Sequence, residues 1–436
     1  MIRRNKGTYD ILPEETEKWQ QVEEVFRKVA RIFNFKEIRT PIFEASELFH
    51  RSVGESSDIV RKETYDFLDR GKRSLTLRPE GTAPVARAVI ENKMYAYPNQ
   101  PLKLYYYGPM FRYERPQKGR QRQFNQFGAE IIGSASPLVD VEMINFAITY
   151  LSGLGIERVK VKVNTLGDQT SKDAYRDALS HYLAPHLNDL CDDCQRRYQE
   201  NPLRVLDCKV DQDSPVLKAA PKPIDYLSDQ AQYHFDHVVE GLKALHIDFE
   251  IDQNLVRGLD YYTHTVFEIL SVSEQLGSQS TIVGGGRYNH LIEELGGPAT
   301  PAVGFAFGAE RLLLELEGTG LFETRNQIHA YFINLDNLFE HRGLEIIQQL
   351  RLGGLVVDYD FANRSLKAQF KQADRLGAKF YLIYGEEEAK RGAIQVKNAE
   401  TGEQSQVSVD RLYQYLINQM QGTSHKSQCG GCSGCH

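Results

Sequence analysis

The stretch FRYERPQKGRQRQFNQFG, residues 111–128, places five Lys or Arg residues beside a single Glu in a chain whose formal net charge is −7. Two segments with the alternation typical of strands, 102–114 and 122–133, flank the polar sequence RPQKGRQ. This pattern predicts an antiparallel hairpin with a long loop. An acidic chain with one basic hairpin is expected to bind anions at a local site and not over its whole surface.

The side chains of this hairpin predict a chemically mixed surface. Because strand side chains alternate between faces, Arg112 and Glu114 share one face, and Gly128 leaves space on the partner strand. The partner strand carries a cation, a ring, an amide and a carboxylate on one face, namely Arg122, Phe124, Gln126 and Glu130. If the two faces coincide, the arginines suit phosphate oxygens and Phe124 can stack on a base. The alternative is a solvated hairpin whose charges only keep the protein soluble.

The N-terminal third reads as a helix followed by strands. Helical spacing predicts a helix over residues 15–33. KEIRTPIFEA, residues 36–45, reads as a strand that contains Pro41, which favours an edge or an interface. TYDFLDRGKRSLTLR, residues 64–78, predicts a second hairpin.

The middle of the chain predicts helices inserted among strands. PEGTAPVARAVIENK, residues 79–93, predicts a helix with Thr82 as its N-cap. Residues 168–250 have helical patterns without obvious strands, and they resemble an inserted helical module. Strand patterns return at 259–270 and 281–283.

Two glycine-bearing segments follow. VGFAFGAERLLLELE, residues 303–317, predicts a strand that runs into a helix with Arg311 in its first turn. A helix N-terminus with an arginine suits phosphate, and a surface salt bridge is the alternative. VGGGRYNHL, residues 283–291, lacks the third glycine of a dinucleotide motif, although its glycines indicate close approach of the backbone to something.

The character of the sequence changes near residue 325. Buried-strand runs alternate with helical stretches over residues 326–422, which predicts a small α/β domain with a sheet that is at least partly parallel. Residues 1–325 are expected to form the other domain. The Cys-rich tail, residues 423–436, cannot form a core and is expected to be disordered.

Composition excludes several classes of protein. No run of 18 apolar residues is present, so no membrane partner is expected. The start MIRRNKGTYDILPEETEKW has no apolar segment, so no secretory signal is expected. Six clustered cysteines predict free thiols in a reducing, cytoplasmic environment.

Several motifs together resemble one family. The hairpin FRYERPQKGRQRQF resembles the second signature motif of class II aminoacyl-tRNA synthetases, GFAFGAERL resembles the third, and the region around Pro41 resembles the first. LRPEGTAP, LVRGLDYYT and GGGRY are similar to histidyl-tRNA synthetases (histidine–tRNA ligases) in particular. The resemblance spans nearly all of residues 1–420, with the motifs in the family's order.

This resemblance implies a fold and an activity. The fold is an α+β catalytic domain, with a mostly antiparallel sheet flanked by helices and a helical insertion, followed by a C-terminal α/β anticodon-binding domain. The implied enzyme is a homodimer with Pro41 near the subunit interface. It is an ATP-dependent ligase that converts L-histidine to histidyl-adenylate and transfers it to the 3′ end of the tRNA for histidine. The alternatives are a histidine-binding regulatory paralogue without charging activity and a class II synthetase for threonine, proline or glycine.

By resemblance, the basic hairpin binds ATP. Arg112 contacts the α-phosphate and Arg311 the distal phosphates, while Phe124 stacks on adenine with Glu114 near its amino group. The loop that contains Arg120 meets ATP or the tRNA acceptor end. Mg²⁺ accompanies ATP and bridges the leaving pyrophosphate.

The resemblance also implies the histidine site. Glu80 and Thr82, with Gln126, hold the α-amino end, and Arg257 contacts the carboxylate and the α-phosphate. The catalytic residues implied are Arg112, Arg257 and Arg311. Glu130 and Tyr262 read the imidazole. The remaining histidine-site residues are Gly81, Tyr261 and Tyr288.

The C-terminal domain carries a basic stripe. One side of the predicted helix in RSLKAQFKQADRLG has Arg364, Lys367, Lys371 and Arg375, and the other side has Leu366, Phe370 and Ala373. A basic stripe over a packed face suits an RNA backbone, so we expect tRNA contacts there. A merely solvated face is the alternative.

The chain departs from the family's pattern at three positions and has two cysteine clusters. His264 stands where the family more often has Arg, and Asn289 and His290 stand where Asp and Gly are usual. Structural zinc is not expected, because Cys191, Cys194 and Cys208 lack a clear fourth ligand. The tail has a further set that could chelate a metal adventitiously, Cys429, Cys432, Cys435 and His436.

Overall fold

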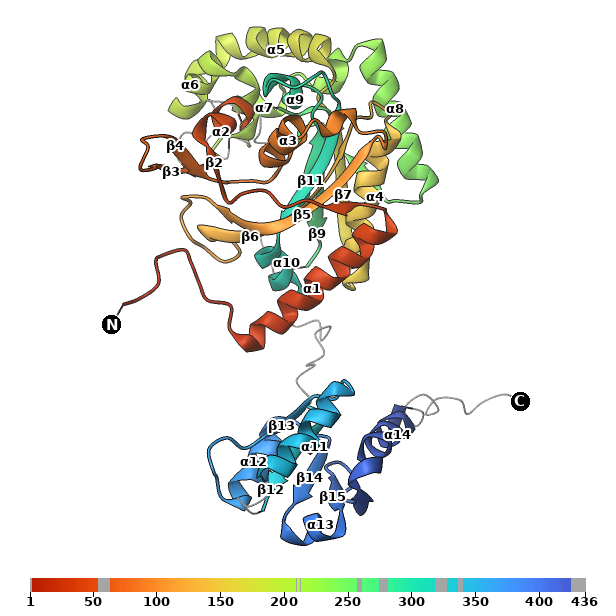
Figure 1. The fold of residues 1–436 in the computed structure, drawn as a ribbon. Coiled ribbons are helices and arrows are strands. Elements are labelled where there is room, and N and C mark those ends of the chain that lie inside the picture. The colour runs from red at the N-terminus through yellow and green to blue at the C-terminus, as the bar shows by residue number, and fades with distance from the viewer. Residues whose placement is uncertain are drawn as a thin grey trace, which may run out of the picture. The chain divides into compact units, whose positions relative to one another are not determined.

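The computed structural model describes residues 2–53, 63–208, 210–211, 213–256, 261–273, 281–317, 328–335 and 340–424. The chain divides into two compact units, Met1–Phe322 and Glu323–His436, which are described separately (Figure 1). Among the described residues, no helix is both long and apolar enough to cross a membrane.

An eight-stranded sheet forms the centre of the larger unit. Its strand order is β1-β5-β6-β11-β10-β9-β7-β8, and the pairs from β5 through to β7 are antiparallel. The edge pairs β1–β5 and β7–β8 are parallel, so the expected mostly antiparallel sheet is confirmed. The strands are β1 (Lys36–Glu37), β5 (Leu102–Phe111), β6 (Gln123–Ile132), β7 (Val159–Thr165), β8 (Phe249–Ile251), β9 (Thr263–Ser271), β10 (Thr281–Arg287) and β11 (Ala302–Gly308).

Three long helices, together with Leu312 and Leu316 of a shorter one, bury the main core against one face of this sheet: α1 (Pro13–Ile32), α4 (Leu138–Gly153) and α8 (Asp229–Ala244). Phe26 of α1 is fully buried and contacts the rings of Phe127 and Tyr150 at centroid distances of 4.7 and 5.0 Å. Large aromatic side chains dominate this interface because each buries a large apolar area. The opposite face, partly covered by α3 (Thr82–Glu91) and α9 (Leu291–Glu294), is the face that carries the candidate site.

Two predictions near the N-terminus are corrected. Pro41 does not lie within one strand, because the chain leaves the large sheet after β1 and enters a separate three-stranded sheet at β2 (Phe43–Ala45). Arg78, which is 6% exposed, fixes this crossing by donating to the carbonyls of Thr40 and Pro109, each at 2.9 Å. The rest of this region is β3 (Tyr65–Leu68), β4 (Ser74–Leu77) and α2 (Ser46–Val53).

The N-cap of α3 is Gly81 and not Thr82. The Glu80 carboxylate accepts from the backbone N–H groups of Thr82 (2.6 Å) and Ala83 (2.8 Å), so a carboxylate one residue earlier satisfies the helix end. The Thr82 hydroxyl is thereby free to donate elsewhere, to Glu130.

The helical insertion between β7 and β8 lies at one end of the larger unit (Figure 1). It has a small core of its own around Tyr175, Leu179 and Leu183. β8 begins at Phe249, just inside the range predicted as helical. The insertion consists of α5 (Gln169–Leu183), η3 (Ala184–Asp189), α6 (Asp192–Glu200), η4 (Pro202–Asp207), α7 (Pro215–Lys218), η5 (Pro223–Tyr226) and α8.

The remaining elements of the larger unit are η2 (Met94–Ala96) and α10 (Ala309–Leu316). β10 is longer than predicted, because the triple glycine that follows Val283 continues the strand to Arg287.

The smaller unit is a five-stranded sheet with helices. Its order is β13-β12-β14-β15-β16, with parallel pairing among the first three strands and antiparallel pairing among the rest. The predicted partly parallel α/β domain is therefore confirmed. Its elements are β12 (Ala330–Asn334), α11 (Glu340–Leu352), β13 (Val357–Tyr359), α12 (Leu366–Arg375), β14 (Phe380–Tyr384), α13 (Glu386–Arg391), β15 (Ala393–Asn398), β16 (Gln404–Ser408), η8 (Val409–Arg411) and α14 (Leu412–Ser424).

Candidate active site

The two strands of the basic hairpin turn the predicted side chains to the same face. β5 and β6 pair so that Gly108 lies opposite Gln126 and Met110 lies opposite Phe124. One step further, the backbone N–H of Arg112 donates to the carbonyl of Arg122 at 2.8 Å. Directly paired residues share a face. The side chains that the sequence predicted on each strand of the hairpin therefore lie on one common face of the sheet.

The next two strands continue this face with very small residues. On β11, Gly304, Ala306 and Gly308 lie opposite Glu130, Gly128 and Gln126 in turn. On β10, Gly286 and Gly284 lie opposite Gly304 and Ala306. The sheet therefore presents a floor of backbone with few side chains, against which a flat ligand can lie.

Gly304 and Gly128 of this floor, and Gly81 before α3, make room for particular groups. A Cβ at Gly304 would lie 1.5 Å from the Glu130 carboxylate. Cβ atoms at Gly81 and Gly128 would lie 2.1 and 2.2 Å from the ring of Tyr106. The space that Gly128 was predicted to leave is therefore filled by Tyr106. A Cβ at Gly308 would meet nothing within 4 Å, so the floor is open there.

Glu130 lies at one end of the face and is fully buried. Its Oε1 accepts from the Thr82 hydroxyl at 2.8 Å, and its Oε2 accepts from the Tyr288 hydroxyl at 2.6 Å. Burial raises the pKa of Glu130 from its ordinary value of 4.5 to about 8, and the hydrogen bonds from Tyr288 and Thr82 oppose this rise. A group with this pKa can exchange a proton or hydrogen bond with an imidazole.

Two further polar groups are buried on this side of the molecule, Glu80 at the amino end of α3 and Gln126 on β6, the strand that carries Glu130. Burial raises the pKa of Glu80, whose two oxygens cap the helix as described above. Gln126 is 7% exposed, and its Oε1 is buried with no hydrogen-bond partner among the described residues. A buried acceptor of this kind is costly unless a ligand supplies the donor, and an ammonium group is a suitable one.

Three tyrosines enclose the same end of the face. The Tyr261 ring lies 4.7 Å from that of Tyr262 and 5.5 Å from that of Tyr288, measured between centroids. Tyr262 packs over Gly286, where a Cβ would lie 2.8 Å from its ring. Lys172 of α5 donates to the carbonyl of Tyr262 and so joins the insertion to this wall. Arg257 lies outside the described residues.

The other end of the face is cationic and aromatic. The Arg112 guanidinium lies 5.3 Å from the centre of the Phe124 ring, and its Nε donates to the carbonyl of Pro79 at 2.9 Å. Glu114 lies between two arginines, with an oxygen 3.9 Å from Arg112 Nη1 and another 3.4 Å from Arg120 Nη1. These side chains form a half-buried group that can bind both phosphate and a purine ring.

Arg311 is the third residue of α10 and completes this cationic end. Its Nη1 donates to the carbonyl of Thr281 at 2.7 Å. Burial and then the nearby charge of Arg120 lower the pKa of Arg311, while Glu114 and Glu268 oppose that change. Several cations that repel one another across a short distance attract a polyanion.

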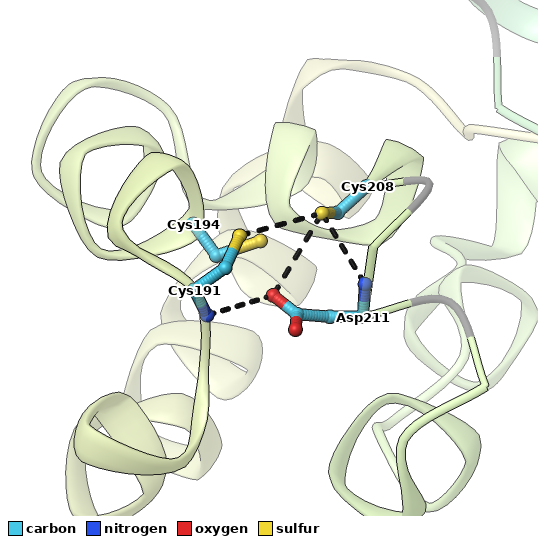
Figure 2. Close-up of side chains that lie close together, drawn as sticks. All are labelled: Cys191, Cys194, Cys208 and Asp211. Atoms are coloured by element: carbon cyan, nitrogen blue, oxygen red, sulfur yellow. Dashed lines mark hydrogen bonds between the residues drawn. The ribbon is translucent and has the colours of Figure 1, made fainter.

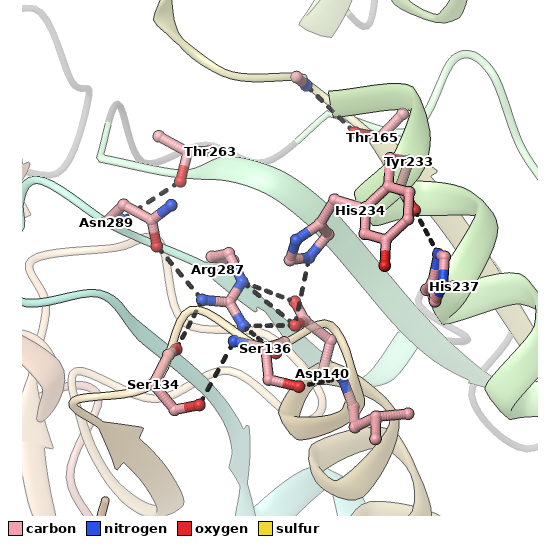
Figure 3. Close-up of polar contacts among 12 residues, drawn as sticks. Ser134, Ser136, Asp140, Thr165, Tyr233, His234, His237, Thr263, Arg287 and Asn289 are labelled. Atoms are coloured by element: carbon pink, nitrogen blue, oxygen red, sulfur yellow. Dashed lines mark hydrogen bonds and ion pairs between the residues drawn. The ribbon is translucent and has the colours of Figure 1, made fainter. Parts of the chain in front are cut away.

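A buried ion-pair network lies at the far end of β10, and Figure 3 shows it together with Asn289, one of the three departures from the family's pattern. Arg287 is fully buried, and its Nε lies 3.1 Å from each Asp140 carboxylate oxygen. Its other nitrogens donate to the carbonyls of Ser134 and Ser136 and to the side chain of Asn289. The bonds to Asp140, Ser134 and Ser136 therefore join β10 to α4 and to the segment that precedes it.

Two of the three departures fit this network. Asn289 accepts from Arg287 at 3.3 Å, as the usual Asp can. Burial, then repulsion from His234 and Arg287, lowers the pKa of His264 to about 4, so its ring stays neutral beside the buried arginine. His290 is exposed and lies 3.8 Å from Glu293.

In the smaller unit, three of the four predicted RNA-binding residues lie one turn apart on α12. Lys367, Lys371 and Arg375 are exposed, and Arg364 precedes the helix and pairs with Asp360 at 3.1 Å. The opposite side is less packed than predicted, because Ala373 is buried and Phe370 half-buried but Leu366 is 45% exposed. The N-terminal turn of α12 faces solvent there.

A cavity of about 190 Å³ lies beside this stripe, lined by Tyr359, Phe361 and Arg364 among others. Phe361 is 74% exposed, and its ring lies 4.1 Å from that of Tyr359. An exposed ring that packs on a half-buried one, beside basic side chains, suits an unstacked base.

The sequence interpretation missed several residues of the face. Tyr106 lies two residues before Gly108 on β5, so the alternation of side chains alone would have placed it on the same face. That its ring fills the space at Gly81 and Gly128 follows only from the tertiary structure. Gly304 and Glu268 join the face through the order β6-β11-β10-β9. No local signal gives that order.

Comparison with known proteins agrees with this geometry. Residues 7–312 match the family model for histidyl-tRNA synthetase, and residues 329–419 match the model for the anticodon-binding domain. The chain is 51% identical over 412 residues to a histidine–tRNA ligase of Bacillus velezensis, covering 94% of this chain and 97% of the relative. It is 47% identical over 422 residues to a histidine–tRNA ligase of Oceanobacillus iheyensis, covering 97% of this chain and 98% of the relative.

A solved structure agrees as well. The crystal structure of the apo histidyl-tRNA synthetase of S. aureus superposes with a TM-score of 0.83 at 40% sequence identity, covering 95% of this chain and all of the other. The chain therefore belongs to the histidyl-tRNA synthetase family.

Proposed function

We propose that this protein activates L-histidine with ATP, which gives histidyl-adenylate and pyrophosphate, and then transfers the histidine to the 3′ end of its tRNA. The observation that carries the proposal is one sheet face with two unlike ends. A buried, doubly hydrogen-bonded Glu130 lies at one end, and Arg112, Arg120 and Arg311 lie at the other. The floor between them is glycine and alanine.

Histidine is recognised at the Glu130 end. The imidazole donates an N–H to Glu130, with Tyr261, Tyr262 and Tyr288 around the ring. A different amino acid would bring no N–H group to the buried carboxylate, and sites that hydrogen-bond their substrate discriminate by about 10⁴–10⁵.

The amino group of histidine lies at the amino end of α3. It donates to Gln126 Oε1, the acceptor that has no partner among the described residues, and it is attracted by the charge of Glu80 when that group is ionised. Thr82 and Gly81 form the turn of backbone beneath it.

ATP binds as its magnesium complex at the cationic end. Phe124 stacks on adenine, Arg112 binds the α-phosphate, and Arg311 binds the distal phosphates. Glu114 and Glu268, the carboxylates whose charges act on Arg311, are oxygen donors that can hold the Mg²⁺ of the nucleotide. The histidine carboxylate then attacks the α-phosphorus in line, while Arg112 and Arg257 stabilise the charge that develops on its oxygens.

The smaller unit binds the anticodon end of the tRNA. Lys367, Lys371 and Arg375 contact phosphates, and an unstacked base enters the cavity beside Phe361.

The protein acts as a cytoplasmic homodimer. Large apolar side chains are exposed on the three-stranded sheet and directly before it, namely Ile42 (44%), Phe43 (52%), Phe67 (42%) and Leu68 (66%). An exposed apolar group of this size on a sheet is typical of a subunit interface.

ATP–pyrophosphate exchange with each of the twenty amino acids tests the proposal. We expect exchange with histidine alone, and an Arg112→Ala variant should lose at least about 10²-fold in rate because a charge-stabilising donor is removed. We also expect the same purified protein to attach histidine to its tRNA, which an aminoacylation assay measures. No exchange with any amino acid would favour a regulatory, histidine-binding role, and exchange with another amino acid would exclude histidine as the substrate.

A further inference from the structure

The helical insertion brings together the side chains of three cysteines and one aspartate (Figure 2). None of the four is among the residues of the proposed active site. Cys191 precedes α6, Cys194 lies in its first turn, and Cys208 follows η4. Asp211 follows three residues later. One ligand atom from each residue lies within 4.8 Å of all the others.

The distances within this cluster match the edges of a metal tetrahedron. Cys191 Sγ and Cys208 Sγ are 3.7 Å apart, and Cys208 Sγ is 3.7 Å from Asp211 Oδ2. With Zn–S bonds of about 2.3 Å, the sulfur atoms of a tetrahedral zinc site lie about 3.8 Å apart. The sulfur atoms of a disulfide lie about 2.05 Å apart, so the spacing fits a shared metal and not a covalent bond.

The backbone around the cluster orients and stabilises anionic ligands. The N–H of Asp211 points to Cys208 Sγ at 3.4 Å, and the N–H of Cys191 donates to Asp211 Oδ2 at 3.0 Å. Cys191 is also the N-cap of the nine-residue helix α6, so the start of that helix fixes the position of one thiol. Hydrogen bonds that hold the ligands in place are a regular part of zinc sites.

The cluster lies where the fold has few other means of support. Cys194 is fully buried and Cys208 is 4% exposed, and both belong to the insertion's own small core. That core has few buried residues and connects short helices, so a crosslink between the start of α6 and the chain after η4 would stabilise it. Small cores often depend on a metal or a disulfide for this reason.

We propose that Cys191, Cys194, Cys208 and Asp211 bind one Zn²⁺ in a tetrahedral, structural site. The sequence showed the three thiols, and the expectation of no structural zinc depended on the missing fourth ligand. The fold supplies that ligand. All four positions are protein side chains, so the site has no open position for a substrate.

Metal content of the purified full-length protein tests the site. Mass spectrometry of the metals should give about one zinc per chain. Because the C-terminal tail has its own Cys and His residues, the measurement is repeated on a variant with Cys429, Cys432 and Cys435 changed to Ser. We expect this variant to keep its zinc and a Cys208→Ser variant to lose it. Loss of zinc from the tail variant, with zinc retained in Cys208→Ser, would overturn the proposal.

A near-isosteric variant separates loss of a ligand from loss of folding. Asp211→Asn keeps the shape of the side chain but removes its charge, and we expect zinc affinity to fall at least about 10-fold, as when groups around a metal are changed. Folding is checked by far-UV circular dichroism. Unchanged affinity in Asp211→Asn would exclude the aspartate as a ligand.

Substitution with Co²⁺ reports the geometry directly. We expect the intense d–d bands of tetrahedral cobalt and a thiolate-to-cobalt charge-transfer band, both absent in Cys208→Ser. Weak octahedral bands, or mass-spectrometric detection of a Cys191–Cys208 disulfide in the purified protein, would overturn the proposal.

Discussion

Glu130 is a carboxyl group with no exposure to solvent and a hydrogen-bond donor on each oxygen. The donors, Thr82 and Tyr288, come from the start of α3 and the end of β10. Together they fix the plane of the carboxylate, which is what a group that reads the orientation of an imidazole requires. The same burial raises its pKa, so its protonation changes at higher pH than that of an ordinary carboxyl group.

Burial raises the pKa of Glu130 from 4.5 to about 8, so the folded protein holds a proton that the unfolded chain releases. The contribution of this group to the free energy of unfolding is therefore complete below about pH 4.5 and is lost as pH rises toward about 8. Urea unfolding of the wild type and Glu130→Gln between pH 5 and pH 9 checks this prediction. We expect the wild type to lose stability relative to the variant across that range, and parallel pH profiles would contradict it.

Gly304 and Gly308 provide a matched pair on one strand and one face. Gly304→Ala would place a methyl group 1.5 Å from the Glu130 carboxylate, whereas Gly308→Ala would place one in open space. We expect Gly304→Ala to lose about 1–3 kcal/mol of stability and to raise the KM for histidine, because the carboxylate must move. We expect Gly308→Ala to keep the melting temperature and to raise the KM for ATP. Equal melting temperatures in the two variants would contradict this.

At the scale of elements, the chain uses helix ends and strand edges for different purposes. The N-terminus of α3 is satisfied by Glu80 and so is not a free anion site. The start of α10 carries Arg311 into the cationic end of the face. On α12, the basic side chains lie on a surface that the smaller unit does not bury.

The stripe on α12 gives a prediction about salt dependence. Changing Lys367 and Lys371 to Gln should weaken tRNA binding and reduce the slope of log K against log salt by about 0.7–0.9 for each phosphate that these lysines no longer neutralise. Histidine-dependent ATP–pyrophosphate exchange should not change, because it needs no tRNA. Lys390→Gln is the control, since Lys390 is exposed on α13 and pairs with Glu386. An effect of equal size in this control would contradict a specific role for α12.

At the scale of the whole molecule, the apolar side chains exposed on the three-stranded sheet are expected to be buried against another protein surface. The rings of Phe43 and Phe67 lie edge to face at 6.4 Å, so they form one continuous patch. Monomeric proteins seldom leave such a patch in water.

We expect Phe67→Glu to convert a dimer to a monomer, because a charge would be buried without a partner at the interface. Light scattering during size-exclusion chromatography measures the mass. Leu352→Glu is the control, since Leu352 is 78% exposed at the end of α11 in the other unit. A wild-type monomer, or a dimer that survives Phe67→Glu, would contradict this surface as the interface.

Local pattern predicted much of the fold. The alternation over 102–114 and 122–133 located β5 and β6 to within a few residues, and periodicity located α1 and α12. These features depend on neighbouring residues only. Where a prediction was wrong, a distant group was responsible: Arg78 holds the chain at Pro41 as it changes sheets, and the Thr82 hydroxyl binds Glu130 instead of capping its helix.

The sequence by itself determined which residue types face which side of each strand, the basic hairpin, and through its motifs the family. Tertiary structure alone decided which of these residues meet. Tyr288 reaches Glu130 across 158 positions and Arg287 reaches Asp140 across 147, and both contacts depend on the order in which the strands assemble. The same holds for Asp211, one of many acidic residues until the fold of the insertion places it beside three thiols. Periodicity is a property of adjacent residues, whereas a site is formed by residues that the packing of the whole unit brings together.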